Sequence, residues 1–154
     1  MKRIYNREKA LEYAHKWVFS RNPNFYNFDN IGGDCTNFVS QCLYAGGMPM
    51  NYTKDKGWYY VSSKDRAAAW TGVEYLYKFL TTNKCTGPRA VIKPIKEAQI
   101  GDIIQISYDG ERFGHSLFVV STSPLLVNHH SDVDAQNRPF SSYVYNKARL
   151  LAIE

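Results

Sequence analysis

Hydrophobic positions recur at helical spacing through the first half of this 154-residue chain, with charged and polar residues between them. This period predicts amphipathic helices that bury one face. Asn6 is placed to cap the first helix, and Gly46-Gly47 follow the second as a C-terminal stop. We therefore expect three helices, over about residues 7–18, 35–44 and 69–80.

The last third of the chain changes to short runs of β-forming residues broken by Gly, Asp, Ser and Pro. These runs predict strands over residues 100–106, 115–120, 124–130 and 148–153. Asp109-Gly110 is a strong hairpin signal between the first two. Because helices come first and strands follow, we expect an α+β domain, with N-terminal helices packed on one face of a small antiparallel meander.

Aromatic residues gather in two stretches outside these elements. The segment 20–30 interleaves turn formers with rings, and we expect an ordered loop that forms one wall of a site, with Tyr26 as a substrate contact. Gly57-Trp58-Tyr59-Tyr60 stands in polar surroundings. Such a cluster either covers the side of a core or binds sugar or peptide, and on the second interpretation Trp58 contacts substrate.

Length and charge limit the classes of protein. The chain is long enough for one core, so we expect a single domain over residues 1–154 that acts as a monomer. Its net charge of +5 favours anionic partners, but the basic residues are scattered and match no nucleic-acid motif, so we expect no nucleic-acid binding. No apolar run reaches the ~18 residues of a membrane span, and Met1-Lys2-Arg3 leads into a charged segment where a signal peptide would have an apolar one.

Three cysteines leave at least one thiol free within a single chain, and no Cys-x-x-Cys pair supports a structural zinc site. Asp132 and Asp134 resemble the start of a calcium loop, but Asn137 stands where that loop needs glycine and Tyr143 where it needs glutamate. We therefore expect no metal and no cofactor.

Cys35 is the strongest candidate for chemistry, because it follows Gly32-Gly33-Asp34 and opens the second predicted helix. Glycines let the backbone turn sharply, and a helix N-terminus can lower a thiol pKa from about 8.5 into the ~3.5–7.5 range. We expect Cys35 to be a nucleophile, and Cys42 and Cys85 to be ordinary cysteines.

A cysteine nucleophile needs a base, and His115 stands at the start of a predicted strand. A third polar group should orient the imidazole. Side chains alternate along a strand, so Asn128 and His130 point one way and His129 the other. We favour His130 as the orienting group, then Asn128, then His129.

The stretch Asp34-Cys35-Thr36-Asn37-Phe38-Val39-Ser40-Gln41, with Gly101-Asp102 before one strand and Gly114-His115-Ser116 starting the next, resembles the papain-like NlpC and CHAP class of bacterial cell-wall amidases. Within that class the chain is most similar to the putative amidase domain family, over nearly its whole length. The resemblance implies a papain-like fold, with Cys35 as nucleophile, His115 as base and then acid, and a polar orienting residue from the strand that ends at His130. We expect Asp34 to contact substrate, and Asn37 and Gln41 to have mainly structural roles.

The resemblance also implies a cysteine amidase or peptidase that hydrolyses an amide bond of peptidoglycan through a thioester. It places the chain outside the cell or at the cell wall, as a domain of a secreted bacterial protein. Two alternatives stay open: a non-catalytic wall-binding module, and an acyltransferase or small-amide hydrolase that uses the same cysteine and histidine.

Overall fold

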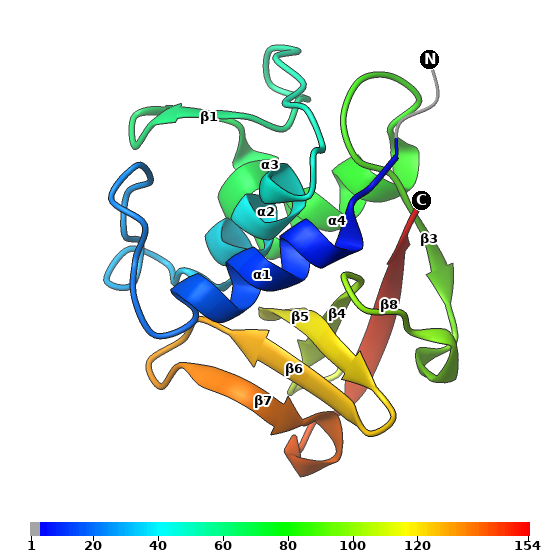
Figure 1. The fold of residues 1–154 in the computed structure, drawn as a ribbon. Coiled ribbons are helices and arrows are strands. Elements are labelled where there is room, and N and C mark those ends of the chain that lie inside the picture. Colours follow the sequence, from blue (N-terminus) through cyan, green and yellow to red (C-terminus); the bar gives the residue numbers. More distant parts are fainter. Residues whose placement is uncertain (1–3) are drawn as a thin grey trace.

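The helices lie together on one side of a six-stranded antiparallel sheet (Figure 1). This arrangement, seen in a computed structural model that describes residues 4–154, confirms the expected α+β class. The stretch Met1-Lys2-Arg3, which led to the expectation of no signal peptide, lies outside the described residues. Within residues 4–154, every helix is too short or too polar to cross a membrane.

The first two helices begin and end where the sequence indicates. Helix α1 spans Arg7–Trp17, and the Asn6 side chain accepts a hydrogen bond of 3.0 Å from the Lys9 backbone N–H. Helix α2 spans Cys35–Ala45 and ends at Gly46, before Gly47 at φ +92°. A positive φ is cheap only for glycine, so this pair stops the helix.

The third predicted helix is wrong in one respect, because the structure divides it in two. Helix α3 spans Ala68–Thr71 and helix α4 spans Val73–Thr82. Gly72 between them is extended, at φ −109° and ψ 128°. The hydrophobic spacing continues across the break because both pieces bury residues in the same core.

The sheet has the order β3-β8-β4-β5-β6-β7, so it is not the simple meander that the sequence predicts. The predicted strands correspond to β4 (Ile103–Ser107), β5 (His115–Thr122), β6 (Leu125–His129) and β8 (Lys147–Ile153). The last of these returns to pair with β4 instead of extending the meander.

The two outer strands, β3 (Ala90–Lys93) and β7 (Ala135–Pro139), are not predicted. Both are largely exposed; β3 has only four residues and β7 consists mainly of polar ones, so periodicity does not reveal them. Four further elements lie outside this sheet: β1 (Tyr60–Ser62), β2 (Asp65–Arg66) and the 3₁₀ helices η1 (Ile95–Glu97) and η2 (Phe140–Ser142).

Each face of the sheet has its own hydrophobic core. Phe118 of β5 packs with the helices, whereas its neighbour Leu117 packs on the opposite face. That opposite core also contains Phe140 and Tyr143, from the segment that follows β7. Side chains alternate along β5 and β6, so each one contacts either the helices or the core on the opposite face, which we call the far core.

Trp58 belongs to the helix-side core, so the prediction that it contacts substrate is not supported. It has 0% exposure, its ring lies 4.6 Å from that of Trp70, and its indole N–H donates to the Ser40 hydroxyl at 3.0 Å. A large ring sealed in this way stabilises the fold by burial and has no surface for a ligand.

Candidate functional site

The start of helix α2 brings Cys35 to the sheet. Gly32 and Gly33 have φ of +81° and +98°, values that allow the sharp approach to the helix. Cys35 is the first residue of α2, so its backbone N–H has no acceptor within the helix. Helix α2 packs on strand β5, which begins at His115.

The Cys35 sulfur lies against the beginning of β5. It is 3.8 Å from the Thr36 hydroxyl, and the backbone of Ser116, the residue next to His115, acts to lower its pKa. The Ser116 hydroxyl in turn lies 3.0 Å from that of Thr36. The fold therefore joins two segments that are 80 residues apart in sequence, Thr36 and Ser116.

Burial raises the pKa of the Cys35 thiol, and the nearby Asp34 charge adds to this effect. Hydrogen bonds from Ser116 and Thr36 lower the pKa but offset only part of it. The expectation of a lowered pKa is therefore wrong in direction: at 8% exposure, desolvation of the thiolate outweighs the favourable helix terminus. Cys35 is a neutral thiol near neutral pH until a base removes its proton.

His115, the first residue of β5, precedes Ser116 and carries a neutral imidazole. Its half-buried ring lies 6.1 Å from Tyr108 and 5.7 Å from His129, measured between ring centroids. Burial lowers the pKa of His115, and the charge of Asp132 opposes this without reversing it. Its Nδ1 is covered and has no hydrogen-bond partner among residues 4–154. A neutral, unpartnered ring nitrogen can accept a proton.

His129 is the histidine of β6 that shares a face with His115. Its ring lies between His115 and Tyr143, with centroids 5.7 Å from each. It is 3% exposed, and neither ring nitrogen has a partner within the described chain. Burial, and after it the neighbouring His115, lowers its pKa to about 4.

His130 and Asn128 lie on the helix side, as the predicted alternation requires, and both have other partners. His130 Nδ1 is 2.6 Å from the Asp34 carboxylate, its Nε2 is 2.7 Å from the Trp17 carbonyl, and its ring stacks on Phe38. Asn128 donates to the Ala14 carbonyl and accepts from the Asn137 backbone N–H at 2.8 Å. In the described chain, no contact joins either side chain to His115.

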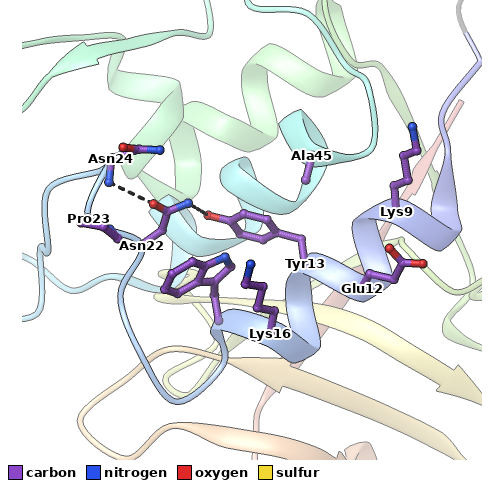
Figure 2. Close-up of a pocket in the computed structure, with 9 residues that line it drawn as sticks. Lys9, Glu12, Tyr13, Lys16, Asn22, Pro23, Asn24 and Ala45 are labelled. Atoms are coloured by element: carbon purple, nitrogen blue, oxygen red, sulfur yellow. Dashed lines mark hydrogen bonds between the residues drawn. The ribbon is translucent and has the colours of Figure 1, made fainter.

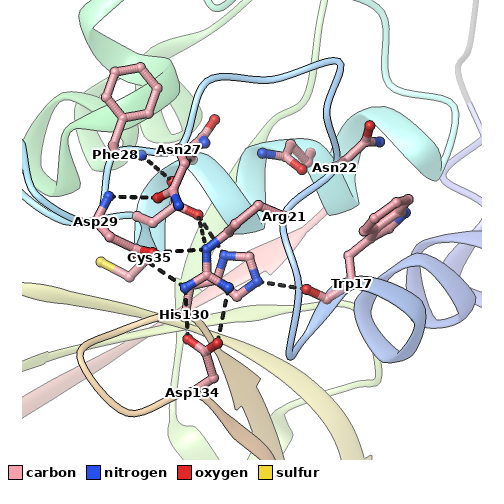
Figure 3. A network of polar contacts seen from close by, with 12 residues as sticks. Trp17, Arg21, Asn22, Asn27, Phe28, Asp29, Cys35, His130 and Asp134 are labelled. Carbon is pink, nitrogen blue, oxygen red and sulfur yellow. Dashed lines mark hydrogen bonds and ion pairs between the residues drawn. The ribbon is translucent and has the colours of Figure 1, made fainter.

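Asp34 is the centre of a buried polar network beside Cys35. Figure 3 shows this network from close by, with Arg21, His130 and Cys35 labelled. One carboxylate oxygen accepts from the Phe28 backbone and the Asn37 amide, each at 2.9 Å, and the other faces His130. With 1% exposure, Asp34 has no open surface for the substrate contact that the sequence predicts. Its carboxylate instead holds the glycine turn and β6 together.

Arg21 extends this network to the surface. It binds Asp29 and Asp134 through its guanidinium group and lies 3.5 Å from Asp34. The segment 20–30 is therefore ordered by ion pairs, as well as by the Tyr26 N–H that donates to the Tyr60 hydroxyl. The Tyr26 side chain is 45% exposed, so its predicted role in binding substrate stays open.

A groove of about 420 Å³ opens beside Cys35 and Gly114. Its walls carry Glu74, which accepts from Arg149 at 2.9 Å, and Arg112, whose guanidinium has no acceptor among residues 4–154. The groove therefore presents one unpaired positive charge. Nowhere in the described chain do three or more His, Cys, Asp or Glu side chains form a group that could hold a metal ion.

The network predicts that loss of Asp34 lowers the free energy of unfolding much more than loss of Asp29, although both aspartates face Arg21. We expect Asp34→Ala to lower the free energy of unfolding by about 3–5 kcal/mol, because it leaves His130 and the Phe28 N–H unpaired in the interior. Asp29→Ala, which removes a partly exposed partner of Arg21, should cost at most about 1 kcal/mol. Urea unfolding measures both, and equal losses would show that Asp34 is not an anchor.

The lowered pKa of His129 predicts a loss of stability in acid. Its pKa is about 4 when folded and 6.5 at its ordinary value, so the unfolded chain binds the proton more readily. The stabilisation is complete above pH 6.5 and disappears as the pH falls toward 4. Between pH 7 and 4.5, we expect His129→Gln to lose about 2–3 kcal/mol less than the wild type. Parallel curves for the two proteins would contradict this expectation.

Two proteins of Bacillus subtilis (strain 168) are similar to this chain. The uncharacterized protein YhbB is 39% identical over 121 residues, which cover 76% of the chain and 37% of YhbB. The uncharacterized protein YjcM is 27% identical over 137 residues, which cover 82% of the chain and 31% of YjcM. The chain thus spans about a third of each relative.

No solved structure matches the chain closely enough to identify its fold. The family model described as "Putative amidase domain" matches residues 4–153, which is nearly everything that the structure describes. The match includes the glycine turn before Cys35, the start of β5 and the whole of the sheet. The chain is therefore a member of the putative amidase domain family.

Proposed function

We propose that this protein is a cysteine amidase that hydrolyses amide bonds, with Cys35 as nucleophile and His115 as base. The observation that carries the proposal is the contact of 3.0 Å between the hydroxyls of Thr36 and Ser116, which holds the start of α2, with Cys35, against the start of β5, with His115. The groove that opens at Cys35 and Gly114 supplies access for a substrate.

The reaction begins from a neutral thiol and a neutral imidazole, the states that burial favours. As Cys35 Sγ attacks the amide carbonyl, its proton passes to His115. The C–N bond then breaks, His115 returns the proton to the departing amine, and a thioester remains on Cys35. A water gives its proton to His115 and attacks the thioester, which releases the carboxylic acid and restores the thiol.

The negative oxygen that forms during attack needs hydrogen-bond donors. The Cys35 backbone N–H, without an acceptor in helix α2, is the first donor that we propose. We assign the second to residues 24–30, the ordered segment in which Tyr26 is exposed.

We also propose that His129 orients His115. The favoured candidates, His130 and Asn128, are engaged on the helix side, whereas the His129 ring lies 5.7 Å from that of His115 and has both nitrogens free of partners within residues 4–154. His130 then acts indirectly, by fixing Asp34 next to Cys35.

The substrate that we propose is a stem or cross-link peptide of peptidoglycan, cleaved by a single papain-like domain of the NlpC and CHAP type at the bacterial cell wall. The family assignment supports an amide substrate, and the net charge of +5 suits an anionic wall. The unpaired Arg112 in the groove would attract a carboxylate of such a peptide. A wall-binding module that uses Trp58 loses its support, because Trp58 is sealed in the core.

Substitution of either reacting group tests the proposed mechanism. Cys35→Ala should lower turnover at least about 10³-fold, and His115→Ala about 10²–10⁴-fold, while circular dichroism shows an unchanged fold. Cys42→Ala is the matched control: it removes the other buried thiol, which lies in the core, and should leave turnover nearly unchanged. Mass spectrometry of muropeptide products reads out cleavage. Equal activity of wild type and Cys35→Ala on every amide would refute the mechanism.

Substitution of His129 separates a positioning role from a structural one. We expect His129→Ala to lower kcat about tenfold to a hundredfold with little change in KM, because His115 is then held less precisely. His129→Gln, which can still bond to an imidazole, should restore part of kcat. If His130→Gln lowered kcat more than His129→Ala in equally stable proteins, the orienting role would belong to His130.

A further inference from the structure

A second recess lies away from Cys35, where helices α1 and α2 meet the segment 20–30. It consists of two adjoining depressions, of about 560 and 450 Å³, that share Tyr13, Asn22 and Asn24. Figure 2 shows Asn22 between the Tyr13 hydroxyl and the backbone of Asn24. We call this recess the α1–α2 groove. It is separate from the groove beside Cys35, with which it shares no lining residue.

Gln41 supplies the groove with an unused hydrogen-bond donor. The residue is only 4% exposed, and its amide oxygen accepts from the Tyr13 hydroxyl. Its amide nitrogen has no acceptor among residues 4–154, yet unlike the His129 nitrogens it is not fully covered. This N–H is therefore available to an acceptor that enters the groove.

The groove also carries a second amide without a partner, exposed aromatic rings and charged side chains. The Asn24 side-chain amide is exposed and has no hydrogen-bond partner in the described part of the chain. Ring surfaces lie next to the amides: Tyr44 is 46% exposed, and Tyr60 lines the same wall. Lys9 and Lys16 stand on the α1 side, with Glu12 as the one carboxylate (Figure 2).

Ring faces beside amide donors and acceptors are the chemistry that recognises a sugar. A pyranose stacks its C–H face on an aromatic ring, while its hydroxyl and acetamido groups exchange hydrogen bonds with side-chain amides. An acetamido carbonyl is a strong acceptor of the kind that Gln41 lacks. We infer that the α1–α2 groove binds a β-linked chain of N-acetylated amino sugars.

The inference concerns binding and does not require that Cys35 hydrolyse amides. It would give the protein a second point of attachment to a glycan, at a distance from the reacting sulfur. Gln41 and Tyr44 lie six and nine residues after Cys35 on α2, which corresponds to about 9 and 14 Å along the helix axis.

The test is titration of the isotope-labelled protein with chitotetraose, a β-1,4-linked tetramer of N-acetylglucosamine, followed by NMR. We expect saturable shifts of the Gln41 and Asn24 side-chain amide signals. Cellotetraose, which lacks acetamido groups, should bind about tenfold more weakly, the loss that one good hydrogen bond produces.

Substitutions of exposed side chains test the binding site without disturbing the fold. Tyr44→Ala and Asn24→Ala change exposed side chains and should each weaken binding about tenfold, as should Gln41→Leu if it folds. Tyr145→Ala is the control, because Tyr145 is also exposed but packs on Phe140 at the far core. Its affinity should equal that of the wild type.

Absence of saturable shifts in the groove would overturn the inference, as would equal binding by the Tyr44→Ala variant. Shifts produced by a stem peptide but not by chitotetraose would also overturn it and would assign the groove to peptide. Because Cys35→Ala should bind chitotetraose like the wild type, failure of the glycan site and failure of the amidase mechanism are distinguishable.

Discussion

The buried ion-paired contact between Asp34 and His130 holds the site in place. The Trp17 carbonyl can only accept, so His130 Nε2 carries a hydrogen, and a second hydrogen lies between Nδ1 and the carboxylate, 2.6 Å apart. Through these two side chains, the end of α1, the start of α2 and the end of β6 meet at one point. A pair of this kind is costly to break, because each partner would remain charged or unpaired in the interior.

This anchor explains why the buried Cys35 keeps its place at the start of α2, beside a groove. The carboxylate of its neighbour Asp34 binds Phe28, Asn37 and His130, which holds the glycine turn against the sheet. Cys35, His115 and His129 are consequently all desolvated, and burial shifts each pKa toward the neutral form. In the mechanism that we propose, neutral groups therefore exchange a proton during the reaction, in contrast to a preformed thiolate and imidazolium pair.

Local features of the chain were predictable where they depend on near neighbours. The cap at Asn6, the glycine stop after α2 and the turn at Gly110 follow from residues within a few positions of one another. The place of β8 between β3 and β4 depends on pairing across the whole chain, which periodicity does not record. The polar surroundings of Trp58 in sequence likewise say nothing of Trp70 and Phe79, against which it packs.

For the site, the amino-acid sequence by itself determined the residue types, the helix start at Cys35, the strand start at His115 and the opposite orientation of His129 and His130. These depend on glycine, on helix termini and on the two-residue period of a strand. The tertiary structure alone determined that His129, and not His130, lies on the face of His115. That outcome depends on the register of β5 against β6, and a shift of one residue would exchange the two histidines.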